Sequence, residues 1–206
     1  MKVLIACEFS GTVREAFAAL GHDAWSCDLL PTEIPGQHYE GSVFHMLCDS
    51  RFSMGFDLII AHPPCTYLTN SGVRWLYNAD KTRNEARWID MYEGACFFRT
   101  LLNNSTDRVC IENPIPHKYA SELIGKKYDQ IIQPWQFGHG ETKATCLWLK
   151  GLPKLQPTNI VEGREPRVHM ATPGPDRWKE RSRTYKGIAQ AMAQQWGSLN
   201  QKQNAA

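Results

Sequence analysis

Short apolar runs of strand length alternate with amphipathic stretches along the 206-residue chain. The first run, KVLIAC, is followed by a turn and by a stretch of helical spacing that Gly21 closes. Strand-length runs recur at 2–7, 23–27, 42–47, 57–61, 108–111, 130–137 and 144–149. Helical spacing is found at 13–20, 83–102 and 185–196. This alternation predicts an α/β fold with a mostly parallel sheet and a final antiparallel hairpin.

The two longer helical patterns each predict one buried face. Ile188, Met192 and Trp196 share a face of the last helix. The pattern over 83–102 places a further group of apolar side chains in the core. That group is Trp88, Met91, Tyr92, Ala95, Phe98 and Leu102.

Length and composition favour one domain. With 42% hydrophobic and 21% charged residues, the chain can form one sizeable core. We expect a single domain over 1–199, in which 153–183, poor in apolar residues, forms an irregular segment on the surface or over the site. The polar tail 200–206 is expected to be disordered.

Net charge and cysteine content indicate which partners and which cellular compartment to expect. A formal net charge of +2 is too mild to indicate nucleic acid by itself, although Lys and Arg cluster at 74–87 and 177–186. The seven cysteines are scattered without a Cys-x-x-Cys pair, which predicts free thiols in a reducing cytoplasm and no metal site. No apolar run approaches the ~18 residues of a membrane span, so we expect no membrane association.

Candidate chemistry begins where the apolar run opened by Asp57 meets two prolines. Pro63 and Pro64 cannot continue a strand, and they deliver Cys65 just past its end, where open α/β sheets keep their functional groups. A random cysteine is more often a small buried hydrophobe than a nucleophile. Glu112 favours the nucleophile over the buried hydrophobe. It directly follows the predicted strand at 108–111 and would lie near the thiol if the two strands are neighbours.

Two further features of the sequence are, taken alone, weaker evidence for a binding site. Asp28 follows Glu8 by 20 positions, the spacing at which a Rossmann-like fold binds ribose hydroxyls, although a capping or solvent-facing aspartate is about equally expected. The segment 66–87 mixes arginines with aromatic residues. This mixture suits phosphate contacts and base stacking, or a solvated loop with anchoring aromatics.

The order of these motifs resembles that of the DNA cytosine-5 methyltransferases, in particular the small versions encoded by bacteriophages. The resemblance covers about Val3 to Leu149. It is carried by Phe9-Ser10-Gly11, Asp28-Leu29, Asp49, Pro63-Pro64-Cys65 and Glu112-Asn113. It implies a Rossmann-like class I methyltransferase fold, S-adenosylmethionine as cofactor and a pyrimidine in DNA as substrate.

The resemblance also implies a role for each matched residue. Cys65 would add to carbon-6 of cytosine, and Glu112 would hydrogen-bond ring N3 and the exocyclic amine. The cofactor would contact Phe9, Ser10, Gly11, Thr12, Asp28, Leu29, Asp49 and Pro63. The substrate would contact Pro64, Arg74 and Asn113. Lys143 is a candidate substitute for an arginine-bearing motif that is not clear in this chain.

The chain also departs from the family pattern. Thr12 or Val13 stands where a further glycine is usual, and Pro114 follows Glu-Asn where valine is usual. Only about thirty residues separate Pro153 from Arg183, too few for a separate target-recognition domain. We therefore expect relaxed or short sequence specificity, a protein partner, or a substrate other than duplex DNA.

Two other readings remain open. Amino methylation of adenine or cytosine ranks lower, because His62-Pro-Pro-Cys65 lacks both the acidic or amide residue and the aromatic residue of that signature. A cofactor-binding or nucleic-acid-binding protein without turnover is favoured by two weakened motifs: the first lacks a further glycine, and the family's late glycine-asparagine motif is reduced at best to Gly187. The intact pair of Cys65 and Glu112 argues against it.

Overall fold

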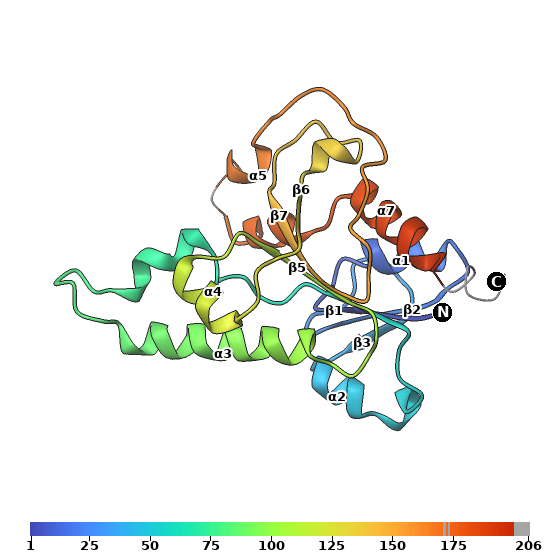
Figure 1. Ribbon diagram of the computed structural model, residues 1–206, viewed down its shortest axis with the longest axis horizontal. Coiled ribbons are helices and arrows are strands. Elements are labelled where there is room, and N and C mark those ends of the chain that lie inside the picture. Colours follow the sequence, from blue (N-terminus) through green and yellow to red (C-terminus); the bar gives the residue numbers. More distant parts are fainter. Residues whose placement is uncertain (171, 173, 200–206) are drawn as a thin grey trace.

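The computed structural model describes residues 1–170, 172 and 174–199 (Figure 1). Its centre is a seven-stranded sheet in the order β3-β2-β1-β4-β5-β7-β6. β1 to β5 pair in parallel, whereas β7 is antiparallel to both β5 and β6, so the predicted α/β fold is confirmed. The strands are β1 Lys2–Ala6, β2 Asp23–Asp28, β3 His38–Glu40, β4 Leu58–Ala61, β5 Val109–Pro114, β6 Gln130–Ile132 and β7 Thr145–Lys150.

Helices cover both faces of this sheet (Figure 1). Val3 and Ile5 of β1 belong to a core shared with α1 and α7, whereas Leu4 and Ala6 belong to a core shared with α2, α3 and α4. The α-helices are α1 Thr12–Ala18, α2 Val43–Cys48, α3 Glu85–Leu102, α4 Lys118–Ile124, α5 Arg167–Met170, α6 Arg177–Ser182 and α7 Lys186–Gly197. Three 3-10 helices are η1 Ser50–Phe52, η2 Asn70–Leu76 and η3 Pro134–Gln136.

Most of the predicted helical core is present. Met91, Ala95, Phe98 and Leu102 of α3 are buried, as are Ile188, Met192 and Trp196 of α7. The placement of Tyr92 in the core was wrong, since its side chain is 54% exposed. Within the described part of the chain, no helix is long and apolar enough to cross a lipid bilayer.

Two predicted strands need correction. The segment 42–47 was predicted as a strand but forms helix α2, in which Val43 and Met46 are buried at a spacing of three residues. The strand of this region is β3, His38–Glu40, which precedes that segment. The strand predicted over 130–137 ends at Ile132, because Pro134 cannot donate to a sheet and begins η3.

The covering segment and the tail were also predicted. The described residues of 153–183 contain two short helices, α5 and α6, in an otherwise irregular path. Parallel bridges join Phe137 to Asn159 and Glu141 to Glu165, which ties this segment to the loop before β7. The predicted tail 200–206 lies outside the described residues.

Candidate active site

The turn after β4 fixes the position of Cys65. The amide of His62 donates to the carbonyl of Ala6 over 2.9 Å, so the turn starts from the sheet. After the two prolines, the carbonyl of Cys65 accepts from the amides of Leu68 and Thr69 at 3.0 and 3.2 Å. The thiol therefore sits on a turn whose backbone is held at both ends.

The neighbouring strand β5 brings an acid and an amide to the same place. Ala61 pairs with Ile111 in parallel register, so the residues that follow them lie side by side. Asn113 is buried, and its Nδ2 donates to the carbonyl of Pro63 over 2.8 Å. Glu112 Oε2 lies 2.5 Å from Nδ1 of His62. The predicted convergence of the two strand ends is therefore present.

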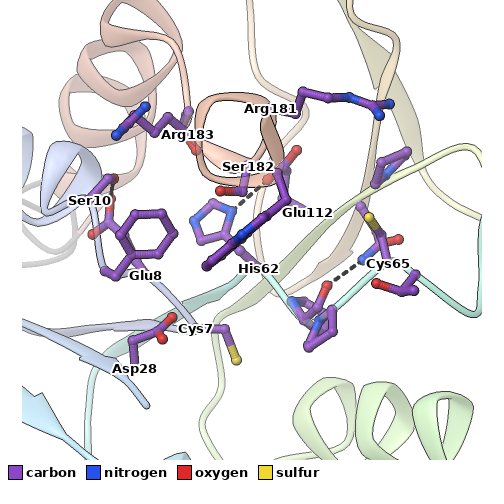
Figure 2. Close-up of a pocket in the computed structure, with 18 of the residues that line it drawn as sticks. Cys7, Glu8, Ser10, Asp28, His62, Cys65, Glu112, Arg181, Ser182 and Arg183 are labelled. Atoms are coloured by element: carbon purple, nitrogen blue, oxygen red, sulfur yellow. Dashed lines mark hydrogen bonds and ion pairs between the residues drawn. The ribbon is translucent and has the colours of Figure 1, made fainter. Parts of the chain in front are cut away.

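A cavity of about 310 Å³ is lined by the residues that follow β4, His62 to Cys65, and by Glu112 and Asn113 of β5 (Figure 2). The carboxyl ends of β1, β2, β4 and β5 contribute to it, and Lys143 joins them because β7 runs in the opposite direction and starts here. Of the predicted site residues, the cavity brings together Phe9, Ser10, Asp28, Pro63, Pro64, Cys65, Glu112, Asn113 and Lys143.

Opposing charges act on the thiol in this cavity. Burial and the negative charge of Glu112 raise the pKa of Cys65 above its ordinary value. The cations of Lys143 and Arg181 act in the opposite direction and favour the thiolate. A bound ligand that shields Glu112 would therefore shift the thiol toward its nucleophilic form.

A second cavity of about 480 Å³ adjoins the first, and the two share Cys7, Asp28 and Pro64. Its wall contains the predicted cofactor residue Leu29, together with Val43 and further side chains. Those include Tyr67, Asp90, Glu93 and Phe97. Cys7, at the junction, has a φ of 59°, a left-handed conformation that is uncommon outside glycine.

One solved structure resembles this chain over most of its length. The chain is similar to an E. coli protein assigned as a DNA modification methyltransferase encoded within prophage Cp-, with a TM-score of 0.50 and 16% identity over 78% of this chain and 51% of that chain. The chain has the class I methyltransferase fold. The resemblance inferred from the motifs is thus confirmed for the fold.

Two further solved structures have lower TM-scores. The S. pombe Dnmt2 methyltransferase has a TM-score of 0.41 and 14% identity over 82% of this chain and 52% of that chain. The Entamoeba histolytica methyltransferase EhMeth has a TM-score of 0.45 and 14% identity over 77% and 57%. The chain spans about half the length of these structures. No family model and no curated protein sequence matches it.

Within this methyltransferase fold, four predicted residues lie outside both cavities. Asp49 caps η1 and forms an ion pair with Arg51 at 2.8 Å. Arg74 lies in η2 and stacks on Trp75 with 4.5 Å between guanidinium and ring. The other two are Gly11 and Thr12, which start helix α1.

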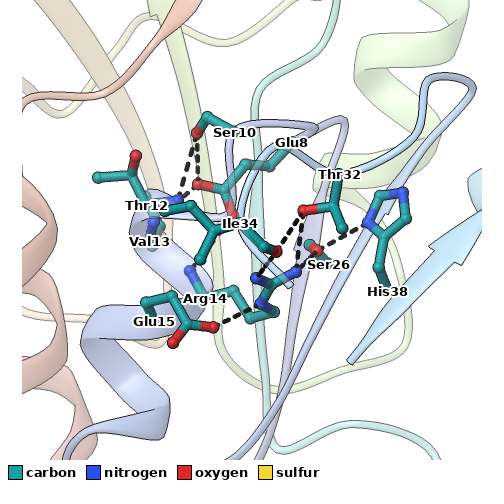
Figure 3. A network of polar contacts seen from close by, with 10 residues as sticks. All are labelled: Glu8, Ser10, Thr12, Val13, Arg14, Glu15, Ser26, Thr32, Ile34 and His38. Atoms are coloured by element: carbon teal, nitrogen blue, oxygen red, sulfur yellow. Dashed lines mark hydrogen bonds and ion pairs between the residues drawn. The ribbon is translucent and has the colours of Figure 1, made fainter. Parts of the chain in front are cut away.

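The turn before α1 contains a polar network that the sequence did not indicate (Figure 3). Glu8 accepts hydrogen bonds from the amides of Val13 and Arg14 at 2.7 and 3.2 Å. The buried guanidinium of Arg14 donates to Ser26 and to further acceptors in the loop after β2. Gly11 has a φ of 72°, and a Cβ there would lie 2.7 Å from Nη2 of Arg14. The network therefore requires glycine at the family's first motif.

Helix α6 lines the cavity, and it belongs to the segment 153–183 that the sequence predicted to lie on the surface or over the site. The rings of Trp178 and Phe9 are 5.8 Å apart, and Arg181 and Arg183 also line the cavity. The chain is held there because Arg183 pairs with Glu33 and its carbonyl accepts from Nζ of Lys143 over 3.2 Å. The only signal in the sequence was the basic cluster at 177–186.

Proposed function

We propose that the chain is an S-adenosylmethionine-dependent methyltransferase that methylates carbon-5 of cytosine in DNA through a covalent Cys65 adduct. One observation carries this proposal. The thiol of Cys65 and the carboxyl group of Glu112 line one cavity, which adjoins a second cavity at Asp28. A binding module has no need for a nucleophile beside an acid.

The first cavity suits a pyrimidine ring. The thiolate of Cys65 would add to carbon-6, and Glu112 would stabilise the charge that moves toward N3. Asn113 holds the carbonyl of Pro63 and so fixes the prolines on which the thiol is mounted. Lys143, from the start of β7, would supply positive charge near the ring.

The second cavity suits the adenosine part of S-adenosylmethionine, which supplies an electrophilic methyl group. Asp28 ends β2, and its Oδ1 accepts from the amide of Leu30 over 3.0 Å, so the carboxylate is held in place. Its other oxygen would accept from ribose hydroxyls. Val43 and Phe97 provide apolar walls for a purine. Phe9, Ser10 and Pro63 would contact the methionine end from the first cavity.

The proposed partner is DNA with the target base rotated out of the helix, because the thiol lies inside a cavity covered by α6. Arg181 and Arg183 on this cover would contact phosphates, together with Arg74 on η2. We further propose that target choice is relaxed or depends on a protein partner. The site of action would be the cytoplasm of a bacterial or phage-infected cell.

The test is mass spectrometry of the intact protein after incubation with S-adenosylmethionine and an oligonucleotide containing 5-fluorocytosine. Fluorine at carbon-5 blocks the final elimination, so a working enzyme becomes trapped on its substrate. We expect an adduct with the mass of protein, oligonucleotide and one methyl group. Cys65→Ala should abolish it.

Cys48→Ala is the matched control, because Cys48 is also a free thiol but is exposed at the end of α2. It should form the adduct at the wild-type rate. Single-stranded and double-stranded oligonucleotides run in parallel would identify the substrate form. No adduct with either, while S-adenosylmethionine still binds, would reject DNA cytosine-5 methylation and favour the binding role.

A further inference from the structure

His62 stands directly before the two prolines and forms a close contact with the acid of the site. Its Nδ1 lies 2.5 Å from Oε2 of Glu112. Figure 2 shows the two side chains facing each other. They are 10% and 11% exposed, so this contact is shielded from solvent. Both ends of the contact are fixed, because His62 follows β4 and Glu112 belongs to β5.

Charged groups surround His62 from every neighbouring strand end. Glu112 of β5 and Glu8 after β1 favour the imidazolium, whereas Lys143 before β7 opposes it. Asp28 of β2 also interacts electrostatically with the imidazole, and Arg181 of α6 lines the same cavity. The groups that act on His62 or line its cavity therefore comprise three carboxylates and three cations, the third being Arg183, which pairs with Glu33.

The balance favours an ion pair. Burial alone would lower the pKa of His62, but the hydrogen bond and charge of Glu112 raise it above its ordinary value. Burial alone would raise the pKa of Glu112, but His62 and the positive charge of Lys143 lower it. Both shifts favour the charged form of the pair, in which the imidazole holds the proton.

The second ring nitrogen distinguishes this histidine from a structural one. Nε2 of His62 is buried and has no hydrogen-bond partner among the described residues. Buried polar atoms are nearly always paired in folded proteins, so this one points to a ligand contact in the cavity that His62 lines. By contrast, His117 uses both nitrogens, with the amide of Ala120 and the carbonyl of Tyr67.

We infer that His62 positions the carboxyl group of Glu112 and supplies it with the proton that the pyrimidine ring takes up. The inference rests on the proposed function. When the sulfur of Cys65 bonds to carbon-6, the electron pair of the C5–C6 double bond moves through carbon-4 toward N3. N3 then takes a proton that passes from Nδ1 of His62 through the carboxylate of Glu112, which leaves a neutral imidazole and Glu112 again ionised. The proton returns when the carbon–sulfur bond breaks.

Nuclear magnetic resonance of protein labelled with ¹⁵N-histidine tests the pair without any activity. His62→Asn identifies the resonances of His62 by their loss. Glu112→Gln should lower the midpoint of the His62 titration by about one pH unit or more, since it removes the paired charge. His22 and His117 serve as internal controls whose midpoints should not move. An unchanged His62 midpoint in Glu112→Gln would overturn the pairing.

The pH dependence of adduct formation tests the proton supply. Asparagine at position 62 can donate an amide N–H to Glu112 but carries no titrating proton. In the wild type, the logarithm of the trapping rate plotted against pH should change slope at the His62 midpoint found by resonance. In His62→Asn that change of slope should be lost, with a rate at least tenfold lower near neutral pH.

The outcomes separate the two proposals. Wild-type rate and wild-type pH profile in His62→Asn would show that His62 is only structural, and the proton supply would be rejected. If the wild-type protein forms no adduct, the proton supply falls together with the proposed function. The resonance experiment would still decide whether Glu112 and His62 form the charged pair.

Discussion

Asp28 shows how a single residue can serve two parts of one site. Its Oδ1 holds the turn after β2 through the amide of Leu30, and the side chain lines both cavities. Burial raises the pKa of this half-buried carboxyl, although the hydrogen bond from Leu30 and the charge of His38 oppose the rise. The residue therefore combines a fixed direction with a carboxyl group at the junction of the two cavities.

Asp28→Ala should weaken S-adenosylmethionine binding by roughly 10- to 100-fold, because a charge-assisted hydrogen bond contributes about 1.5–3 kcal/mol. Isothermal titration calorimetry measures the dissociation constant. Asp23→Ala is the matched control, since Asp23 begins the same strand and is exposed. Equal affinities in the two variants would remove Asp28 from the cofactor site.

At the residue scale, the sequence predicted where site residues lie better than it predicted which side chains contact them. Cys65, Glu112 and Asn113 could be placed because strand ends in a parallel sheet meet at one edge. The contact between Glu112 and His62 could not be predicted, since it depends on rotamers and on the parallel register of β4 and β5. Asp49 matched a motif by order alone, and its side chain is used by η1 and Arg51.

At the scale of elements, helix α1 is capped by an acid from the preceding turn. Glu8 is buried and accepts from the amides of Val13 and Arg14, and its Oε1 also accepts from the hydroxyl of Ser10. The first amides of a helix otherwise lack partners. The carboxylate of Glu8 also lies at the positive end of the helix dipole.

Glu8→Ala should lower the free energy of unfolding by about 1–2 kcal/mol, the usual effect of losing a helix cap. Urea unfolding followed by circular dichroism measures the change. Glu122→Ala provides the comparison, because Glu122 is an exposed glutamate on α4. A loss in Glu8→Ala no larger than that in Glu122→Ala would contradict the capping role.

The sequence predicted correctly whether a segment is a helix or a strand where its apolar residues followed only one of the two spacings. The run over 58–61 is buried on both faces of the sheet, so it contains no competing helical signal. The segment 42–47 is short enough to fit either period, and packing of Val43 and Met46 against the sheet selects the helix. Helix α4 was missed, although the cap by His117 and the left-handed Gly125 mark its two ends.

For the whole molecule, the sheet separates two cores and carries the charged site at one edge. The pair of His62 and Glu112 makes stability depend on pH. Because the pKa of His62 is raised, its contribution is complete below its ordinary value of 6.5 and is lost as pH rises through the folded value. Because the pKa of Glu112 is lowered, its contribution is complete above 4.5 and is lost as pH falls through the folded value.

The difference in unfolding free energy between wild type and His62→Asn should therefore favour the wild type most between pH 4.5 and 6.5. Above this window it should fall by up to ~1.4 kcal/mol per pH unit. Urea titrations at several pH values measure it. His22 and His117, whose pKa values are lowered mainly by burial, are present in both proteins and cancel. A difference independent of pH would contradict the charged pair.

The capping of α1 by Glu8 has a consequence for which metabolites can compete at the site. Many nucleotide-binding folds use the free amides after the first strand to hold a phosphate. Here a carboxylate already occupies the amides of Val13 and Arg14, so an approaching phosphate would meet negative charge. Dinucleotides and nucleoside triphosphates are thereby repelled. A cofactor that joins adenosine to an amino acid through a sulfonium brings no phosphate and carries a positive centre instead.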